Sequence, residues 1–222
     1  MSRVPASAFL NHDGRIDWVR RAKLSHVDGA EIDLYWIPLG AGAGGALVRW
    51  SGRAYETLAA RGARRARCEL FHSALMVRVD GAVTAVEMAP VWTKRGERGV
   101  VAEGAVGRRS LGRSRLFRYE VRSWLGGSIP DVAAAVGGPV VLSSDPDLAR
   151  RMIELVPDVP TMVWGRDELR TGDMWNSNSL VSWLLVRSGV DTTGIGPPAG
   201  GRAPGWDAGL VAASRQPTAA DP

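Results

Sequence analysis

The sequence lacks paired cysteines, long apolar runs and a recognisable leader. Cys68 is its one cysteine, which excludes an intrachain disulfide and a cysteine-rich zinc site. The longest apolar run, over residues 132–142, has 11 residues and contains two glycines, whereas a membrane-spanning helix needs about 20. Residues 1–10 are too few and too mixed to form the hydrophobic region of a signal peptide. We therefore expect a soluble protein of the cytoplasm with no membrane span.

The length and composition of the chain are typical of a globular protein. The chain has 222 residues, of which 45% are hydrophobic and 23% are charged, and this is enough to bury a sizeable core. Polar, weakly periodic stretches lie at both ends. We expect a poorly ordered lead-in over residues 1–30, a single α+β domain over residues 31–213 and a disordered tail over residues 214–222.

Arginine gives the chain its basic charge. Lysine and arginine number 28 against 23 acidic residues, for a net charge of +5 and a pI of about 10.1. The basic residues gather in three clusters, at residues 20–23, 61–67 and 108–118. Such clusters can hold an anionic partner or can simply be solvated faces. Neither a row of stacking aromatics nor a helix-turn-helix pattern accompanies them, so the sequence does not favour nucleic acid as the partner.

Strand patterns cluster in the middle of the sequence and helix patterns flank them. This order favours an α+β fold, with an antiparallel sheet packed against helices. Asp80-Gly81 suits a type I′ turn and predicts a hairpin over residues 70–89. Ser144 can cap a helix whose first turn accepts Pro146, and Gly189 can end another. The other expected strands are residues 31–39, 100–106, 116–124 and 161–164, and the expected helices are residues 55–65, 129–136, 145–155 and 176–187.

His72 is the most informative histidine, because it lies on the strand that enters the hairpin. If Asp80-Gly81 forms the loop, His72 and Glu87 are diagonal neighbours, about 7–8 Å apart, on the face opposite an apolar one. A carboxylate beside a histidine fixes its tautomer and supports its imidazolium form. The pair could therefore be the base and the orienting acid of a nucleophilic site. The pair could equally be structural, with a neighbouring acid that satisfies the hydrogen-bonding groups of a half-buried histidine. The apolar face would contain Leu75, Val77, Val79, Val86 and Met88.

The run Asn176-Ser177-Asn178-Ser179 opens the apolar helix expected over residues 176–187. A nucleophile at such a helix start gains from the positive end of the helix dipole, and free backbone N–H groups there can hold an oxyanion. Asparagine and serine are also preferred N-cap residues, so the run could serve only to cap the helix.

These two segments resemble the signature of the circularly permuted papain-like (NlpC-type) superfamily, in which a histidine strand precedes an Asn-Cys-x-His-Phe helix start. Lecithin:retinol acyltransferase-like enzymes and the PPPDE peptidases carry versions of it. The helix start is also similar to the Asn-Ser-Asn-Thr-Phe version of an uncharacterised bacterial family. The resemblance implies an antiparallel sheet packed on the nucleophile helix. It further implies a hydrolase or acyltransferase that acts on an amide, thioester or ester of a small-molecule, peptide or lipid substrate, with no cofactor and no metal.

The resemblance also implies a role for each site residue. Ser177 stands where the cysteine would be and becomes the nucleophile, with His72 as the base and Glu87 as the orienting acid. Asn176 and Asn178 support the oxyanion. A hydroxyl is a much weaker nucleophile than a thiol. The second hypothesis is therefore a non-catalytic binding module on the same fold, which holds a partner either in the same groove or, if the partner is anionic, through its arginine clusters.

Two glycine-rich stretches and the cysteine allow further interpretations. Residues 40–45 match G-x-G-x-x-G, but Pro38 interrupts the preceding strand and an antiparallel hairpin follows, so a surface turn is favoured over a dinucleotide site. Residues 197–206 could fold over the helix start as a lid or form a rigid wrap anchored by Trp206. Cys68 is expected to be a small buried hydrophobe.

Overall fold

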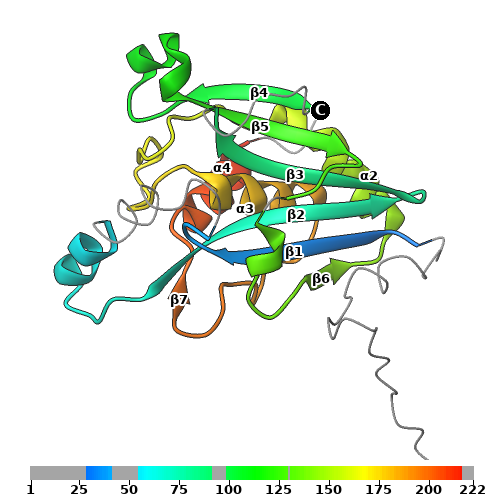
Figure 1. The fold of residues 1–222 in the computed structure, drawn as a ribbon, viewed down its shortest axis with the longest axis horizontal. Coiled ribbons are helices and arrows are strands. Elements are labelled where there is room, and N and C mark those ends of the chain that lie inside the picture. Colours follow the sequence, from blue (N-terminus) through cyan, green and yellow to red (C-terminus); the bar gives the residue numbers. More distant parts are fainter. Residues whose placement is uncertain (1–28, 42–54, 92–98, 130, 217–222) are drawn as a thin grey trace, which may run out of the picture.

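The computed structural model describes residues 29–41, 55–91, 99–129 and 131–216 (Figure 1). Residues 1–28 of the predicted lead-in, the arginine cluster at residues 20–23 and most of the glycine run at residues 40–45 therefore lie outside the described residues. The last residue of the predicted lead-in, Ala30, is buried in the core. Within the described ranges, no helix is long and apolar enough to cross a membrane.

The strands of the described residues form a seven-stranded sheet. The strand order is β4-β5-β3-β2-β1-β6, with antiparallel neighbours throughout, and β7 pairs in parallel with the start of β2. Helices pack on this sheet, so the predicted α+β class is confirmed. The strands are β1 (Glu31–Pro38), β2 (Glu69–Val79), β3 (Ala82–Pro90), β4 (Val100–Ala105), β5 (Arg118–Leu125), β6 (Val140–Ser143) and β7 (Gly201–Arg202).

The hairpin between β2 and β3 forms as predicted. Asp80 and Gly81 have φ angles of 51° and 75°, as a type I′ turn requires. Leu75 consequently faces Val86, and the predicted register is confirmed.

The helices begin and end at residues with local signals. α3 follows the N-cap Asn176 and ends at Gly189, whose φ of 97° places it in the left-handed region. The cap predicted for α2 was wrong: Asp145 caps it instead of Ser144, because the Asp145 carboxylate accepts a backbone N–H bond of 2.8 Å from the first turn. Pro146 opens α2 as expected. The helical elements are a short helix over residues 55–62, α2 (Pro146–Leu155), α3 (Ser177–Ser188), α4 (Trp206–Arg215), and the 3-10 turns η2 (Arg109–Arg113), η3 (Arg115–Phe117), η4 (Val132–Ala134) and η5 (Val156–Asp158).

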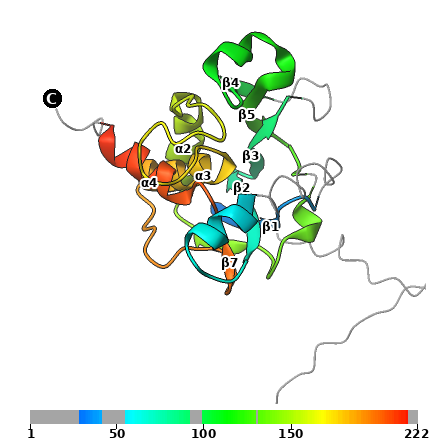
Figure 2. The ribbon, with the colours of Figure 1, turned by 90° about the vertical axis from the view of Figure 1, so that its left-hand side faces the viewer.

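Different elements cover the two faces of the sheet. Helices α2, α3 and α4 lie on one side, here termed the helix face (Figures 1 and 2). The opposite side, the outer face, carries a smaller cluster that Ile129 covers from the segment around η4. Because alternate strand residues point to opposite faces, β2 directs Leu75 to the helices and Ala74 outward. The buried strand residues of the helix face are Ile32, Leu34, Trp36, Phe71, Leu75, Val77, Val86, Met88, Tyr119 and Val121.

Several predicted elements differ from the observed ones. The helix expected over residues 129–136 is the single turn η4, and the chain then enters the edge strand β6, which the sequence pattern did not indicate. The edge strand expected over residues 161–164 is reduced to isolated bridges at Trp164. α4 was not predicted, and it extends to Arg215, inside the expected tail.

Candidate functional site

The polar run at the start of α3 is buried and bonded to the chain itself. Oδ1 of Asn176 accepts from the N–H of Asn178 at 2.9 Å, and Nδ2 of Asn176 donates to the carbonyl of Pro204 at 2.8 Å. The Ser179 hydroxyl accepts from the N–H of Asn176 at 3.0 Å and donates to the carbonyl of Gly205 at 2.7 Å. This is a capping box, which satisfies N–H groups that the start of the helix would otherwise leave free, those of Asn176 and Asn178 among them.

Asn178 ties three segments of the chain together. Its Nδ2 donates to the carbonyls of Phe71 and Pro204, at 3.0 and 2.7 Å. Its Oδ1 accepts from the Ser73 hydroxyl at 2.9 Å. The side-chain amide of this buried residue therefore joins β2, α3 and the turn before α4. A buried polar group with this many partners stabilises the fold.

The turn before α4 fits so closely against α3 that it requires glycine. A Cβ on Gly205, whose φ is 92°, would lie 2.3 Å from Oδ1 of Asn176. The Ser182 hydroxyl donates to the carbonyl of Trp206 at 2.7 Å, and the Trp206 ring packs 5.1 Å from the ring of Trp36. Of the two alternatives for residues 197–206, the structure therefore has the anchored wrap.

Ser177 is the first residue of α3 and is 6% exposed. Asn176 is the N-cap, so Ser177 does not cap the helix. Within the described ranges, no hydrogen bond joins the Ser177 hydroxyl to another residue. Serine needs a base within hydrogen-bond reach to act as a nucleophile, and the position of His72 decides whether one is there.

His72 points to the outer face of the sheet. It lies opposite Ile37 in the pairing of β1 and β2, whereas the adjacent Ser73 points to the helix face and bonds to Asn178. The backbone of β2 therefore separates the His72 imidazole from α3. Burial lowers the pKa of His72 to about 4, and the Asp131 carboxylate only partly opposes this shift. The imidazole is consequently neutral at pH 7.

Glu87 binds an arginine rather than His72. Arg122 lies directly opposite Glu87 on β5 and donates to it at 3.0 Å. The same guanidinium donates to Glu120 at 2.6 Å, and the Arg122 side chain is 3% exposed. The structure thus brings Asn176 and Asn178 next to Ser177 but does not bring His72 and Glu87 to it. The hairpin register could not reveal the competing partner, because β5 supplies it.

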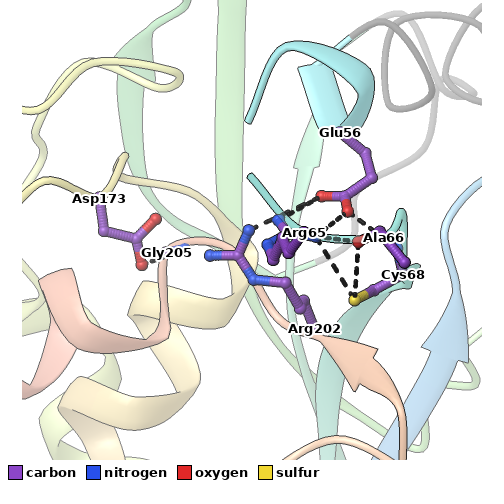
Figure 3. A network of polar contacts seen from close by, with 7 residues as sticks. All are labelled: Glu56, Arg65, Ala66, Cys68, Asp173, Arg202 and Gly205. Carbon is purple, nitrogen blue, oxygen red and sulfur yellow. Dashed lines mark hydrogen bonds and ion pairs between the residues drawn. The ribbon is translucent and has the colours of Figure 1, made fainter. Parts of the chain in front are cut away.

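Figure 3 shows a polar network that the sequence did not indicate. Glu56, whose side chain is 4% exposed, accepts from Nη2 of Arg65 at 3.1 Å and from the N–H of Cys68 at 2.8 Å. The hydrogen bond from Arg65 is the main cause that lowers the pKa of Glu56. Nη1 of Arg202 approaches the same carboxylate at 3.7 Å, and its guanidinium lies between Glu56 and Asp173. The network joins the helix over residues 55–62, the entry to β2 and β7, and Cys68 is half-buried beside it.

The third arginine cluster forms the connection between β4 and β5. This connection, together with the adjoining ends of β4 and β5, is here termed the arginine lobe (residues 104–119); it contains η2 and η3 and projects from the sheet (Figures 1 and 2). It holds five arginines and no acidic residue. Arg109 pairs with Glu168 at 3.0 Å, and Arg118 pairs with Glu103 at 3.2 Å. The other three are exposed and form no ion pair with the described residues: Arg108, Arg113 and Arg115.

Comparisons with protein-family models, with curated proteins and with solved structures found no match to this chain. The resemblance to the permuted papain-like superfamily therefore stays a prediction carried by two short segments.

Proposed function

We propose that this protein is a non-catalytic binding module that holds an anionic partner on its arginine lobe. The observation that supports this function is the positive charge on the surface of the lobe that no acidic residue of the described chain neutralises. Its arginines lie on one short connection, and only Arg109 and Arg118 are paired with acids of the described chain. Clustered guanidinium groups without counter-charges repel one another, and an anionic partner relieves that repulsion. The three that remain for a partner are Arg108, Arg113 and Arg115.

The surroundings of Ser177 favour binding over catalysis. Acyl transfer by a serine needs a base that takes its proton, and His72 lies across the sheet from α3. The Asn178 amide, which would support an oxyanion, is already bonded to β2 and to the turn before α4. Asn176, Asn178 and Glu87 thus have structural partners, and Ser177 has no base on its side of the sheet.

Retention on immobilised heparin, used as a generic polyanion, tests the binding surface. The triple variant Arg108→Gln/Arg113→Gln/Arg115→Gln should elute at a clearly lower salt concentration than the wild type. The control is Arg61→Gln/Arg64→Gln/Arg67→Gln, which removes the same charge from three other exposed arginines. The control should elute close to the wild type. Equal shifts for both triples, or a wild type that is not retained, would overturn the proposal.

A serine-directed fluorophosphonate probe tests the absence of catalysis. The probe should not label the wild-type protein, because no base activates Ser177. Labelling that Ser177→Ala abolishes would show an activated hydroxyl, and the non-catalytic proposal would then fail.

A further inference from the structure

The arginine lobe exposes apolar side chains as well as charge. Leu116 is 66% exposed, Phe117 is 42% exposed and Leu111 is 39% exposed. All three lie in η2 or η3, among the unpaired arginines. Single exposed apolar residues are ordinary on a protein surface. Three of them on one short connection, interspersed with the unpaired arginines, give the lobe an amphipathic composition.

The lobe is held in this arrangement by its own contacts. Nε of Arg118 donates to the carbonyl of Gly112 at 2.5 Å. A Cβ on Gly112 would lie 2.9 Å from the Cβ of Ala105, so the turn packs directly on the end of β4. These contacts tie the turn at Gly112 to the ends of β4 and β5. Leu116, in η3, lies outside the core.

We propose that the arginine lobe docks onto the surface of an anionic lipid bilayer. Leu116 and Phe117 enter the boundary between the headgroups and the acyl chains, while the unpaired arginines bind lipid phosphates. Interfacial binding requires apolar side chains to bury and basic side chains beside them, and the lobe supplies both. This inference rests on the proposed function and names the anionic partner. The phosphate-binding residues are Arg108, Arg113 and Arg115.

The apolar residues favour lipid over nucleic acid. Proteins hold single-stranded nucleic acid by stacking its bases on aromatic rings, and Phe117 is the one aromatic residue of η2 and η3. The most exposed apolar residue is instead Leu116. A leucine side chain gains little from a phosphate backbone, but it is removed from water when it enters a bilayer.

Cosedimentation of the full chain with lipid vesicles tests the inference. Vesicles of mixed phosphatidylcholine and phosphatidylglycerol should bind the protein, and vesicles of phosphatidylcholine alone should not. Each arginine near an anionic leaflet raises the binding constant for the membrane by a factor of about five. The triple variant of Arg108, Arg113 and Arg115 to Gln should therefore bind roughly a hundredfold more weakly.

Leucine variants separate insertion from charge. Leu116→Ser should weaken vesicle binding roughly fivefold, and Leu116→Trp should strengthen it, because tryptophan prefers the membrane interface. The matched control is Leu125→Ser, since Leu125 is 69% exposed and lies at the far end of β5 from the lobe. Binding of this control should equal that of the wild type.

The outcomes distinguish this inference from the proposed function. Equal vesicle binding by Leu116→Ser and Leu125→Ser, or equal binding to neutral and anionic vesicles, would overturn the lipid inference. Binding to oligouridylate in place of vesicles, unaffected by Leu116→Ser, would also overturn it. If heparin retention depends on the lobe but vesicles do not sediment the protein, only the lipid inference fails. If neither depends on the lobe, both fail.

Discussion

The start of α3 and the arginine lobe both carry dense runs of polar residues, and they use them in opposite ways. At α3, Asn176, Asn178 and Ser179 are bonded to neighbouring backbone and side chains inside the molecule. In the lobe, most of the charge points outward without a counter-charge on the described chain. The difference teaches that a chemically suggestive motif can be architectural, while an ordinary-looking charge cluster can be the surface that remains for a partner.

The substitution Asn178→Ala is the strongest test of whether the polar residues at the start of α3 stabilise the fold. The change removes the Asn178 hydrogen bonds to the carbonyl of Phe71 and to the hydroxyl of Ser73, and it removes one of the two donors to the carbonyl of Pro204, which keeps its bond from Asn176. At about 1 kcal/mol for each lost bond, the free energy of unfolding should fall by about 3 kcal/mol. Urea unfolding measures the fall. The matched control is Ser177→Ala, which should stay within about 0.5 kcal/mol of the wild type. Similar losses for both variants would contradict the architectural interpretation.

A smaller change in the free energy of unfolding is expected from the protonation of His72, which lies on the face of the sheet away from α3. Its pKa is about 4 in the folded protein and 6.5 in the unfolded reference. Below pH 6.5 the unfolded chain therefore takes up the proton first, and stability is lost as the pH falls towards 4. The loss should reach about 2 kcal/mol at pH 5. His72→Gln should remove it, as denaturant midpoints between pH 8 and pH 5 would show.

Asp33 acts in the opposite direction and does not confuse this measurement. Burial raises its pKa to about 6, so its folded form binds the proton first and stability rises as the pH falls through that value. Asp33 is present in both the wild type and His72→Gln, and the difference between their profiles isolates His72. Parallel profiles would contradict the burial of the imidazole on the outer face.

The smallest expected effect on stability belongs to the lobe. The triple variant of Arg108, Arg113 and Arg115 to Gln removes exposed charges that have no ion pair in the described chain. Its free energy of unfolding should stay within about 0.5 kcal/mol of the wild type. A loss comparable with that of Asn178→Ala would show that these arginines serve the fold.

The hairpin and α3 were predictable because their signals are local. Asp80 and Gly81 are adjacent residues that adopt the positive φ angles of the turn. This turn fixes the register of β2 and β3. Asn176 and Gly189 mark the two ends of α3 in the same way. Such signals do not depend on where the rest of the chain lies.

The candidate site depended on the packing of distant segments. One signal against it was already present, because the register puts Leu75 and Val77 on one face and His72 on the other. An apolar helix packs on the apolar face, so α3 had to lie across the sheet from His72. No comparable signal in the sequence indicated the contact between Glu87 and Arg122, since Arg122 becomes a neighbour of Glu87 only when β5 pairs with β3.

α4 escaped prediction for a different reason. Its first residue follows Gly205, which takes a left-handed conformation without a side-chain cap. The close packing of Gly209 against Ser182, where a Cβ would lie 2.0 Å from the hydroxyl oxygen, also arises only in the folded chain. The segment is stabilised by contacts with α3, which its own pattern does not reveal.

Arginine footprinting tests the central claim most directly. Phenylglyoxal modifies exposed arginines, and mass spectrometry reads the extent of modification at each one. With saturating heparin, which probes the lobe whatever its native anionic partner, Arg108, Arg113 and Arg115 should be protected, while Arg61 and Arg67 should react as they do in the free protein. Protection of Arg61 and Arg67 with none in the lobe would contradict the account.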